Sequence, residues 1–149
     1  MMYTIGQVSE MLHIPASTLR YYDKEGLFPD LKRVSGIRQF SEKELDALRI
    51  IECLKKSGME IRQIRQYMQW CTEGSASYPK RKALFEEQKK RVEEELRRMN
   101  EILNMLKYKC WYYEQAIENG AEDPLPAIAL EDMPEEIREA YLHSYCTGS

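Results

Sequence analysis

The chain has few of the residues on which metal sites, disulfide frameworks and membrane spans depend. Its 149 residues include two histidines and four cysteines, and the cysteines (Cys53, Cys71, Cys110 and Cys146) form no C-x-x-C pair. This spacing argues against a zinc module and against a disulfide framework. No window approaches the roughly 18 apolar residues of a membrane span, and the N-terminus lacks a signal-peptide core. We therefore expect a cytoplasmic protein with no membrane contact, no metal and no cofactor.

Charge is abundant by contrast, and it is unevenly distributed. Charged residues make up 32% of the chain and hydrophobic residues 43%, which is typical of a charge-rich helical protein. Residues 1–70 carry 11 Lys and Arg against 9 Asp and Glu, whereas residues 71–149 carry 11 against 16. A mildly basic first half permits nucleic-acid binding, but it does not by itself indicate it.

The first 26 residues predict two short helices joined by a tight turn. Thr4 and Gln7 have the spacing of a capping box at the start of the first helix. Pro15 suits the first turn of the second helix, and Gly26 suits its end. Two helices in this succession predict a helix-turn-helix unit.

A hairpin is predicted next, because the runs "LKRV" and "IRQF" meet at Ser35-Gly36. Serine followed by glycine is a reasonable two-residue hairpin turn. Arg33 and Arg38 flank this turn, one on each strand. The hairpin would therefore present two cations close to the helix-turn-helix unit.

Two further helices come after the hairpin. Ser41 and Glu44 form a second capping box, which opens a helix that we expect to stop at Gly58. The stretch "MEIRQIRQYMQWCTEG" predicts a fourth helix that ends at Gly74.

The segment from about residue 79 to 119 predicts one long helix with a heptad repeat. Its apolar positions alternate in steps of three and four, at Leu96, Met99, Leu103, Leu106, Cys110, Tyr113 and Ile117. A helix of about 40 residues is near 60 Å long, and a small compact head cannot bury such a stripe. The pattern predicts pairing with the same helix of a second subunit. The expected fold is mainly α, with a winged helix-turn-helix head (1–75), a coiled-coil dimerisation helix (76–120) and a short tail with one helix from Pro134 (121–149).

One face of the second helix combines groups that suit nucleic acid. Hydroxyl, guanidinium, phenol and ammonium groups lie together there, on Ser17, Arg20, Tyr21 and Lys24. Such groups can contact phosphates and base edges, although the same pattern also fits an ordinary solvated helix face. The hairpin with two arginines favours the combination of a recognition helix in the major groove and a wing on the backbone. The backbone amide of Thr4, at a helix N-terminus, can add a phosphate contact.

The segments "YTIGQVSEMLHIPASTLRYYDKEGLFP" and "SGIRQFSEKELDALRIIECLKKSGMEIRQI" resemble the MerR family of bacterial transcription regulators, and the resemblance runs from about residue 3 to 119. It implies a homodimer joined by an antiparallel coiled coil, with each head on half of a palindrome in an over-long promoter spacer. It also implies that the activated dimer kinks and untwists this double-stranded DNA, so that RNA polymerase engages both promoter elements.

The resemblance also assigns contacts residue by residue. By position, Arg20 and Tyr21 match the family's recognition-helix contacts, and Arg38 matches its wing contact. The predicted DNA-binding set comprises Thr4, Ser17, Thr18, Arg20, Tyr21, Lys24, Arg33 and Arg38.

Cys53 is the candidate for a switch. It falls on the flank of the apolar face of the third helix, and Arg49 and Lys56 lie one turn away on either side. Nearby cations favour the thiolate, which is the reactive form of cysteine. The stretch "IIECLKKSGMEIRQIRQYMQWCTEG" is most similar to the MerR branch that responds to aldehydes and nitrosative stress, which implies a sensor cysteine at this position. The alternative is a small, tolerated residue without a role.

The residues also allow other interpretations. Metal-sensing members keep cysteines in the loop after the long helix, which here reads "NGAEDPLPAI", and His143 with Cys146 makes only a weak pair for a soft metal. A small apolar ligand at the dimer interface is an alternative effector. A thiol enzyme would need a base, and only His13 and His143 are available, so we expect no enzyme. A coiled-coil adaptor without a DNA role is a further alternative. The aromatic run "YKCWYYEQ" is expected to pack in the dimer or to cover the opposite head.

Overall fold

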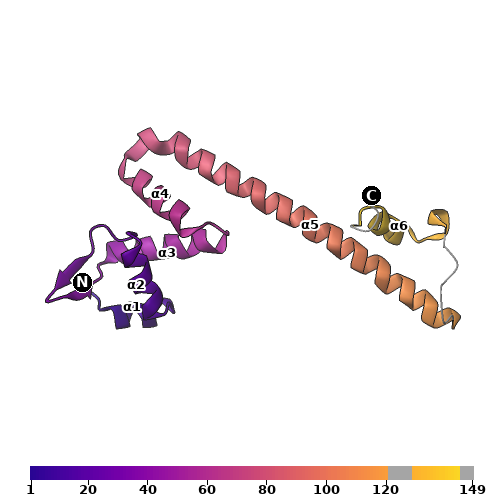
Figure 1. Cartoon of the computed structure of the whole chain (residues 1–149), viewed down its shortest axis with the longest axis horizontal. Helices are drawn as coiled ribbons and strands as arrows, with labels where there is room; N and C mark the ends of the chain where they lie inside the picture. Colours follow the sequence, from indigo (N-terminus) through magenta and orange to yellow (C-terminus); the bar gives the residue numbers. More distant parts are fainter. Residues whose placement is uncertain (121–128, 145–149) are drawn as a thin grey trace. The chain divides into compact units, whose positions relative to one another are not determined.

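The computed structural model describes residues 1–120 and 129–144, so the predictions for Pro124, Pro126 and Cys146 lie outside the described residues. The chain forms two compact units, Met1–Lys89 and a second that begins at Lys90. One long helix belongs to both (Figure 1). None of the described helices is long and apolar enough to span a bilayer.

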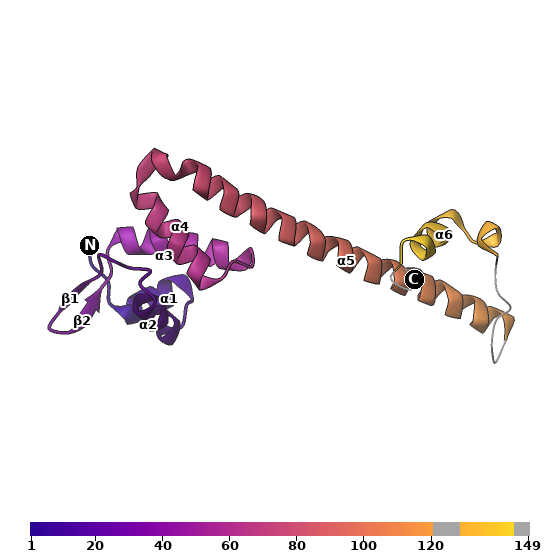
Figure 2. The same cartoon turned by 45° about the horizontal axis from the view of Figure 1, so that its top comes forward.

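The elements have the order expected for a winged helix-turn-helix head and a long helix, which confirms the predicted mainly α fold. The first unit contains α1 (Ile5–Leu12), α2 (Ala16–Lys24), β1 (Lys32–Val34), β2 (Ile37–Gln39), α3 (Glu42–Lys56), α4 (Ile61–Thr72) and η1 (Gly74–Ser77). The long helix is α5 (Tyr78–Asn119), and η2 (Leu130–Asp132) and α6 (Glu135–Leu142) come after it. Figure 2 shows the β1–β2 hairpin projecting from the edge of the helical head.

Three capping boxes determine where helices of the head begin. They pair Thr4 with Gln7 at α1, Ser41 with Glu44 at α3, and Glu60 with Gln63 at α4. In each box the N-cap side chain accepts the amide of the third helical residue, whose own side chain reaches back to the N-cap amide. The first two are as predicted. The third uses glutamate in place of serine or threonine, and the sequence signature therefore missed it.

A single apolar core joins α1 to α4. Its fully buried members come from all four helices and include Val8, Leu19, Tyr22, Leu48, Ile51 and Ile64. The rings of Phe28 and Phe40 meet edge to face, with centroids 5.7 Å apart. Burying each large apolar side chain contributes about 1.5–3 kcal/mol. This core fixes one face of α2 inside the head and leaves its other face to solvent.

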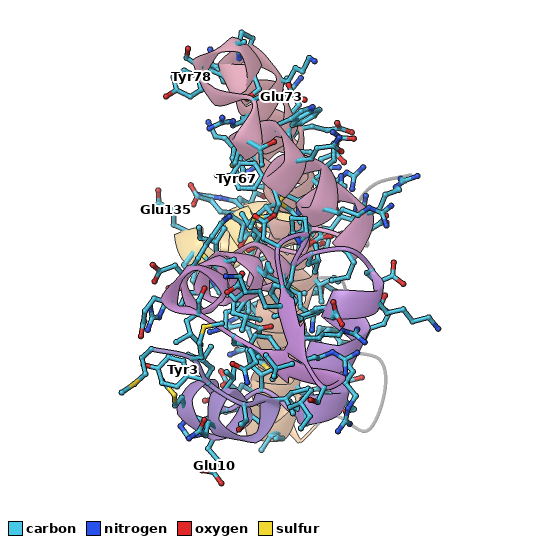
Figure 3. The ribbon with its side chains drawn as sticks, turned by 90° about the vertical axis from the view of Figure 1, so that its left-hand side faces the viewer. Tyr3, Glu10, Tyr67, Glu73, Tyr78 and Glu135 are labelled. Carbon is cyan, nitrogen blue, oxygen red and sulfur yellow. The ribbon has the colours of Figure 1, made fainter. Side chains whose placement is uncertain are left out.

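Tyr3 ties the N-terminus to the end of the hairpin. Its backbone exchanges two hydrogen bonds with Phe40, at 2.7 and 2.9 Å. Its hydroxyl, on the ring labelled in Figure 3, donates to Glu42 Oε1 at 2.6 Å. Tyr3 thereby attaches the base of the hairpin to the segment before α1 and to the first turn of α3.

In the second unit, α6 packs on α5 through aromatic and polar contacts. The rings of Tyr108 and Tyr141 have centroids 4.7 Å apart, and Asn104 Nδ2 donates to the His143 carbonyl at 3.3 Å. At about 100° per residue, Asn104 and Tyr108 lie on the face of α5 opposite the heptad stripe. Tyr108, one member of the aromatic run predicted to pack in the dimer or to cover the opposite head, thus packs against Tyr141 of its own chain.

The burial pattern of α3 predicts a sharp contrast between two adjacent isoleucines. Ile51 is 0% exposed and Ile50 is 43% exposed. We expect Ile51→Ala to lower the free energy of unfolding by about 2–5 kcal/mol, because truncation leaves a cavity in the core. The matched substitution Ile50→Ala should cost under about 1 kcal/mol. Urea unfolding of both variants checks this, and equal losses would contradict the assigned core.

Candidate nucleic-acid interface

The exposed face of α2 carries the side chains that the sequence pattern placed there. Arg20, Lys24 and Tyr21 are exposed, and Ser17 lies with them on the solvent side. The opposite side of the helix is anchored by Leu19 and Tyr22, which the core buries completely. The amphipathic pattern of α2 therefore orients its polar groups outward on a rigid support.

The hairpin turn has the geometry that its sequence predicts. Ser35 and Gly36 both adopt positive φ, at 51° and 77°. This combination is typical of a type I′ turn, which matches the twist of the two strands that it joins. The register pairs Arg33 directly with Arg38 and Val34 with Ile37. Both wing arginines therefore lie opposite each other on the two-stranded ladder.

Asp23 connects the wing to α2, and the sequence reasoning did not single it out. Its Oδ2 accepts from Arg33 Nη2 at 2.8 Å and from Arg38 Nε at 2.7 Å. The side chain of Asp23 is only 13% exposed, compared with 23% for Arg38 and 52% for Arg33. The signal that would have found it is a lone carboxylate on the otherwise cationic exposed side of α2, close in sequence to two wing arginines.

These side chains surround an open hollow of about 440 Å³ between α2 and the wing. Its lining contains six of the eight predicted DNA-binding residues and adds Asp23: Ser17, Arg20, Tyr21, Asp23, Lys24, Arg33 and Arg38. Four cations and one carboxylate give the hollow a net positive charge. A concave, cationic surface with hydroxyl groups suits a phosphate backbone.

The structure does not bring the other two predicted residues, Thr4 and Thr18, into this lining. The Thr4 amide, for which a phosphate contact is predicted, donates to Gln7 Oε1 at 2.9 Å. It is therefore not available to a phosphate while the capping box is closed. Thr18 is half-buried, on the side of α2 between the core and the hollow.

Cys53 is exposed on α3, as its flank position predicts. One of its two neighbouring cations is already paired, because Arg49 Nη1 lies 2.5 Å from Asp46 Oδ1. Cys71 and Cys110 are exposed in the single chain as well. Exposure alone therefore does not distinguish Cys53 from the other two described cysteines.

The residues on either side of Cys53 connect α3 to α2. The buried Tyr22 donates its hydroxyl hydrogen to Glu52 Oε1 at 2.7 Å and accepts from Lys55 Nζ at 3.0 Å. Burial raises the pKa of the Tyr22 hydroxyl, and the hydrogen bond from Lys55 partly offsets this shift. The phenol therefore stays protonated and continues to donate to Glu52 at neutral pH.

Two other features of the described residues bear on what this chain can bind. No group of three or more His, Cys, Asp or Glu side chains in residues 1–120 and 129–144 is placed to hold a metal ion. A hollow of about 660 Å³ lies between α3, α4 and the segment after α2, and its apolar lining includes Leu27, Phe28, Ile50, Met68 and Cys71.

Comparison with known proteins gives one consistent family. Residues 3–70 match the profile of the MerR HTH family regulatory proteins. An uncharacterized HTH-type transcriptional regulator of Haemophilus influenzae is 35% identical over 136 residues, which cover 91% of this chain and 98% of that protein. The HTH-type transcriptional regulator AdhR of Bacillus subtilis is 34% identical over 89 residues, 59% of this chain and 64% of AdhR.

Among solved structures, the chain is similar to HiNmlR, described as a MerR family regulator lacking the sensor domain and bound to promoter DNA. The TM-score is 0.62 at 36% identity, over 80% of this chain and 96% of HiNmlR. The winged head, the long helix and the near-complete coverage of the Haemophilus influenzae regulator and of HiNmlR lead to one conclusion. The chain belongs to the MerR family of helix-turn-helix transcription regulators.

Proposed function

We propose that this protein is a homodimeric regulator that binds double-stranded promoter DNA with α2 in the major groove and the β1–β2 wing on the backbone. The observation that carries the proposal is the cationic hollow between α2 and the wing, in which six side chains predicted to contact DNA converge. The similarity to a family member bound to promoter DNA supports it. Arg20 and Tyr21 serve as the recognition-helix contacts and Arg38 as the wing contact, and Ser17, Lys24 and Arg33 extend the surface.

A second copy of the chain is the partner that α5 requires. The heptad stripe is exposed along its whole length, from Leu96 at 60% to Ile117 at 81%. Because α6 contacts Asn104 and Tyr108 on the opposite face, the stripe from Leu103 onward stays open to another helix. We assign residues 76–120 as an antiparallel coiled-coil dimerisation helix, with residues 1–75 as the head and 121–149 as the tail.

This assembly explains how DNA binding can control transcription. A dimer separates its two heads by a fixed distance, so a bend or twist of the spacer DNA between them changes the register of the flanking promoter elements. Such deformation costs several kcal/mol, which additional contacts must offset. RNA polymerase then responds to the altered DNA and needs no direct contact with the regulator.

Cys53 is the proposed point at which an electrophile acts, as its resemblance to the thiol-sensing branch implies. It is exposed, and its neighbours Glu52 and Lys55 hold Tyr22 of the recognition helix. One turn later, the amide of Ser57 donates to the Cys53 carbonyl at 3.3 Å. The Ser57 carbonyl in turn accepts from Gln88 Nε2 of α5 at 2.7 Å. A covalent adduct at Cys53 therefore acts close to the contacts of α3 with both α2 and α5.

A small apolar effector is the second candidate. The site predicted for it is the dimer interface, and the apolar hollow within the head offers a different one. A ligand there would contact α3 and α4 without reacting with a thiol. This alternative is distinguished from the first by whether the response survives the loss of Cys53.

Removing the proposed contacts should weaken DNA binding selectively. We expect Arg20→Ala and Arg38→Ala each to lower affinity for the operator about 5- to 150-fold, because each removes about 1–3 kcal/mol of contact energy. Arg98→Ala, at an exposed arginine of α5, serves as the matched control and should change nothing. Fluorescence anisotropy with labelled promoter DNA at several salt concentrations provides the measurement. Unchanged binding by both head variants would favour the coiled-coil adaptor.

Dimerisation through the heptad stripe should depend on Leu103 and protect Cys110. We expect Leu103→Asp to shift the protein from dimer to monomer in analytical ultracentrifugation, because a carboxylate cannot be buried in the seam without a partner. Alkylation of Cys110, slow in the dimer, should then accelerate at least about tenfold. Arg98→Asp, on α5 but outside the stripe, should leave both properties unchanged. A monomeric wild-type protein would refute the assembly.

The switch proposal predicts that one thiol alone controls the response. We expect Cys53→Ser to abolish promoter activation by aldehydes while DNA affinity stays within about twofold of wild type, since serine keeps the size of the side chain but removes the nucleophile. Cys71→Ser is the matched control, because Cys71 is also exposed, and it should respond normally. A promoter-fusion assay checks both variants. A full response in Cys53→Ser would favour the apolar ligand.

A further inference from the structure

We infer that Asp23 is a positioning residue for DNA binding: it holds the wing against α2 and limits the charge that the free protein offers to non-specific DNA. This inference rests on the proposed DNA-binding function. It concerns a carboxylate at the centre of a cationic surface, where an anion would at first be expected to repel the ligand.

The wing cannot hold its own position. Each of its strands has three residues, and all three residues of β1 are exposed. An isolated two-stranded hairpin is at best marginally stable in water. Its register also places Arg33 directly opposite Arg38, and like charges directly opposite each other destabilise a strand pair. The hairpin therefore needs an attachment and a counter-charge.

Asp23 supplies both from α2. One of its carboxylate oxygens accepts from both guanidinium groups, at 2.8 and 2.7 Å. Hydrogen bonds between charged groups are about twice as strong as neutral ones. Because Asp23 is 13% exposed and Arg38 23% exposed, solvent screens their ion pair less than a surface pair. The carboxylate thus converts a repulsive pair of arginines into an attractive triad.

The two arginines are held unequally. Arg38 donates to Asp23 through Nε and is 23% exposed. Arg33 uses Nη2 and is 52% exposed, which makes it the more accessible of the two cations. A DNA phosphate can therefore engage Arg33 from solvent, while Arg38 keeps its Nε hydrogen bond to Asp23 and contacts the DNA backbone through its remaining donors.

The triad affects DNA binding in two ways. Because the wing is already in place, binding to the operator does not pay the entropy of ordering it. Because the hollow contains one negative charge, the electrostatic attraction between its four cations and DNA of any sequence is weaker. Asp23 therefore increases the ratio of specific to non-specific affinity.

The test compares Asp23→Asn with Asp46→Asn, using the full-length protein. Both variants remove one negative charge from the head, but Asp23 pairs with Arg33 and Arg38. Asp46 pairs only with Arg49 on α3 and does not line the cationic hollow. For Asp23→Asn we expect tighter binding to a non-operator duplex at low salt and weaker binding to the operator at high salt. The plot of log affinity against log salt should steepen by about 0.9, the effect of one additional phosphate contact. Asp46→Asn should keep the wild-type slope.

A second measurement needs no DNA. Trypsin cleaves after lysine and arginine, and the wing contains Lys32, Arg33 and Arg38. We expect cleavage there to be at least about fivefold faster in Asp23→Asn than in wild type or Asp46→Asn, because proteolysis tracks local opening. Asp23→Glu, which restores the carboxylate, should recover most of the protection and the wild-type salt slope.

The outcomes separate the inference from the function on which it rests. If wild type does not bind promoter DNA, the proposed function fails, whereas the trypsin result still decides whether Asp23 orders the wing. If wild type binds and Asp23→Asn behaves like Asp46→Asn in both measurements, Asp23 contributes only general charge and the inference is wrong.

Discussion

The burial of Leu19 and Tyr22 is the constraint on which the rest of the head depends. Both side chains are completely inside the core, and they face away from the cationic side of α2. A helix of nine residues has little stability of its own. Its position therefore comes from tertiary packing, and every polar group on its outer face is placed by apolar contacts on its inner face. The Tyr22 hydroxyl adds a polar attachment to α3 at the same point.

The features that local sequence determines were predictable. The boxes at Thr4 and Ser41 mark helix starts because each needs only residues three apart, and the turn at Ser35-Gly36 needs only two residues that tolerate positive φ. The outward face of α2 followed from helical periodicity alone. The family motifs in the first 70 residues indicated that this surface binds DNA, which periodicity alone cannot indicate.

The contacts of Asp23 and Tyr108, which the sequence did not reveal, join distant parts of the chain. Asp23 meets Arg33 and Arg38 only after the hairpin folds back on α2, and a carboxylate within a basic surface looks like a departure from the pattern. The sequence predicted the capping box at Thr4. It did not show that this box occupies the Thr4 amide, which donates to Gln7 and so cannot donate to a phosphate at the same time. Nothing local indicates that Tyr141 returns to contact Tyr108, so the sequence did not reveal this contact.

The placement of α6 on the far side of α5 also has an evolutionary meaning. The contacts of the tail with Asn104 and Tyr108 lie opposite the heptad stripe, so substitutions of Tyr141 leave the pairing surface from Leu103 onward intact. During evolution the segment after α5 can then become longer, become shorter or be replaced without loss of the dimerisation surface. The long helix can therefore keep its dimerisation surface and the DNA-binding head while the regulatory segment that follows it changes.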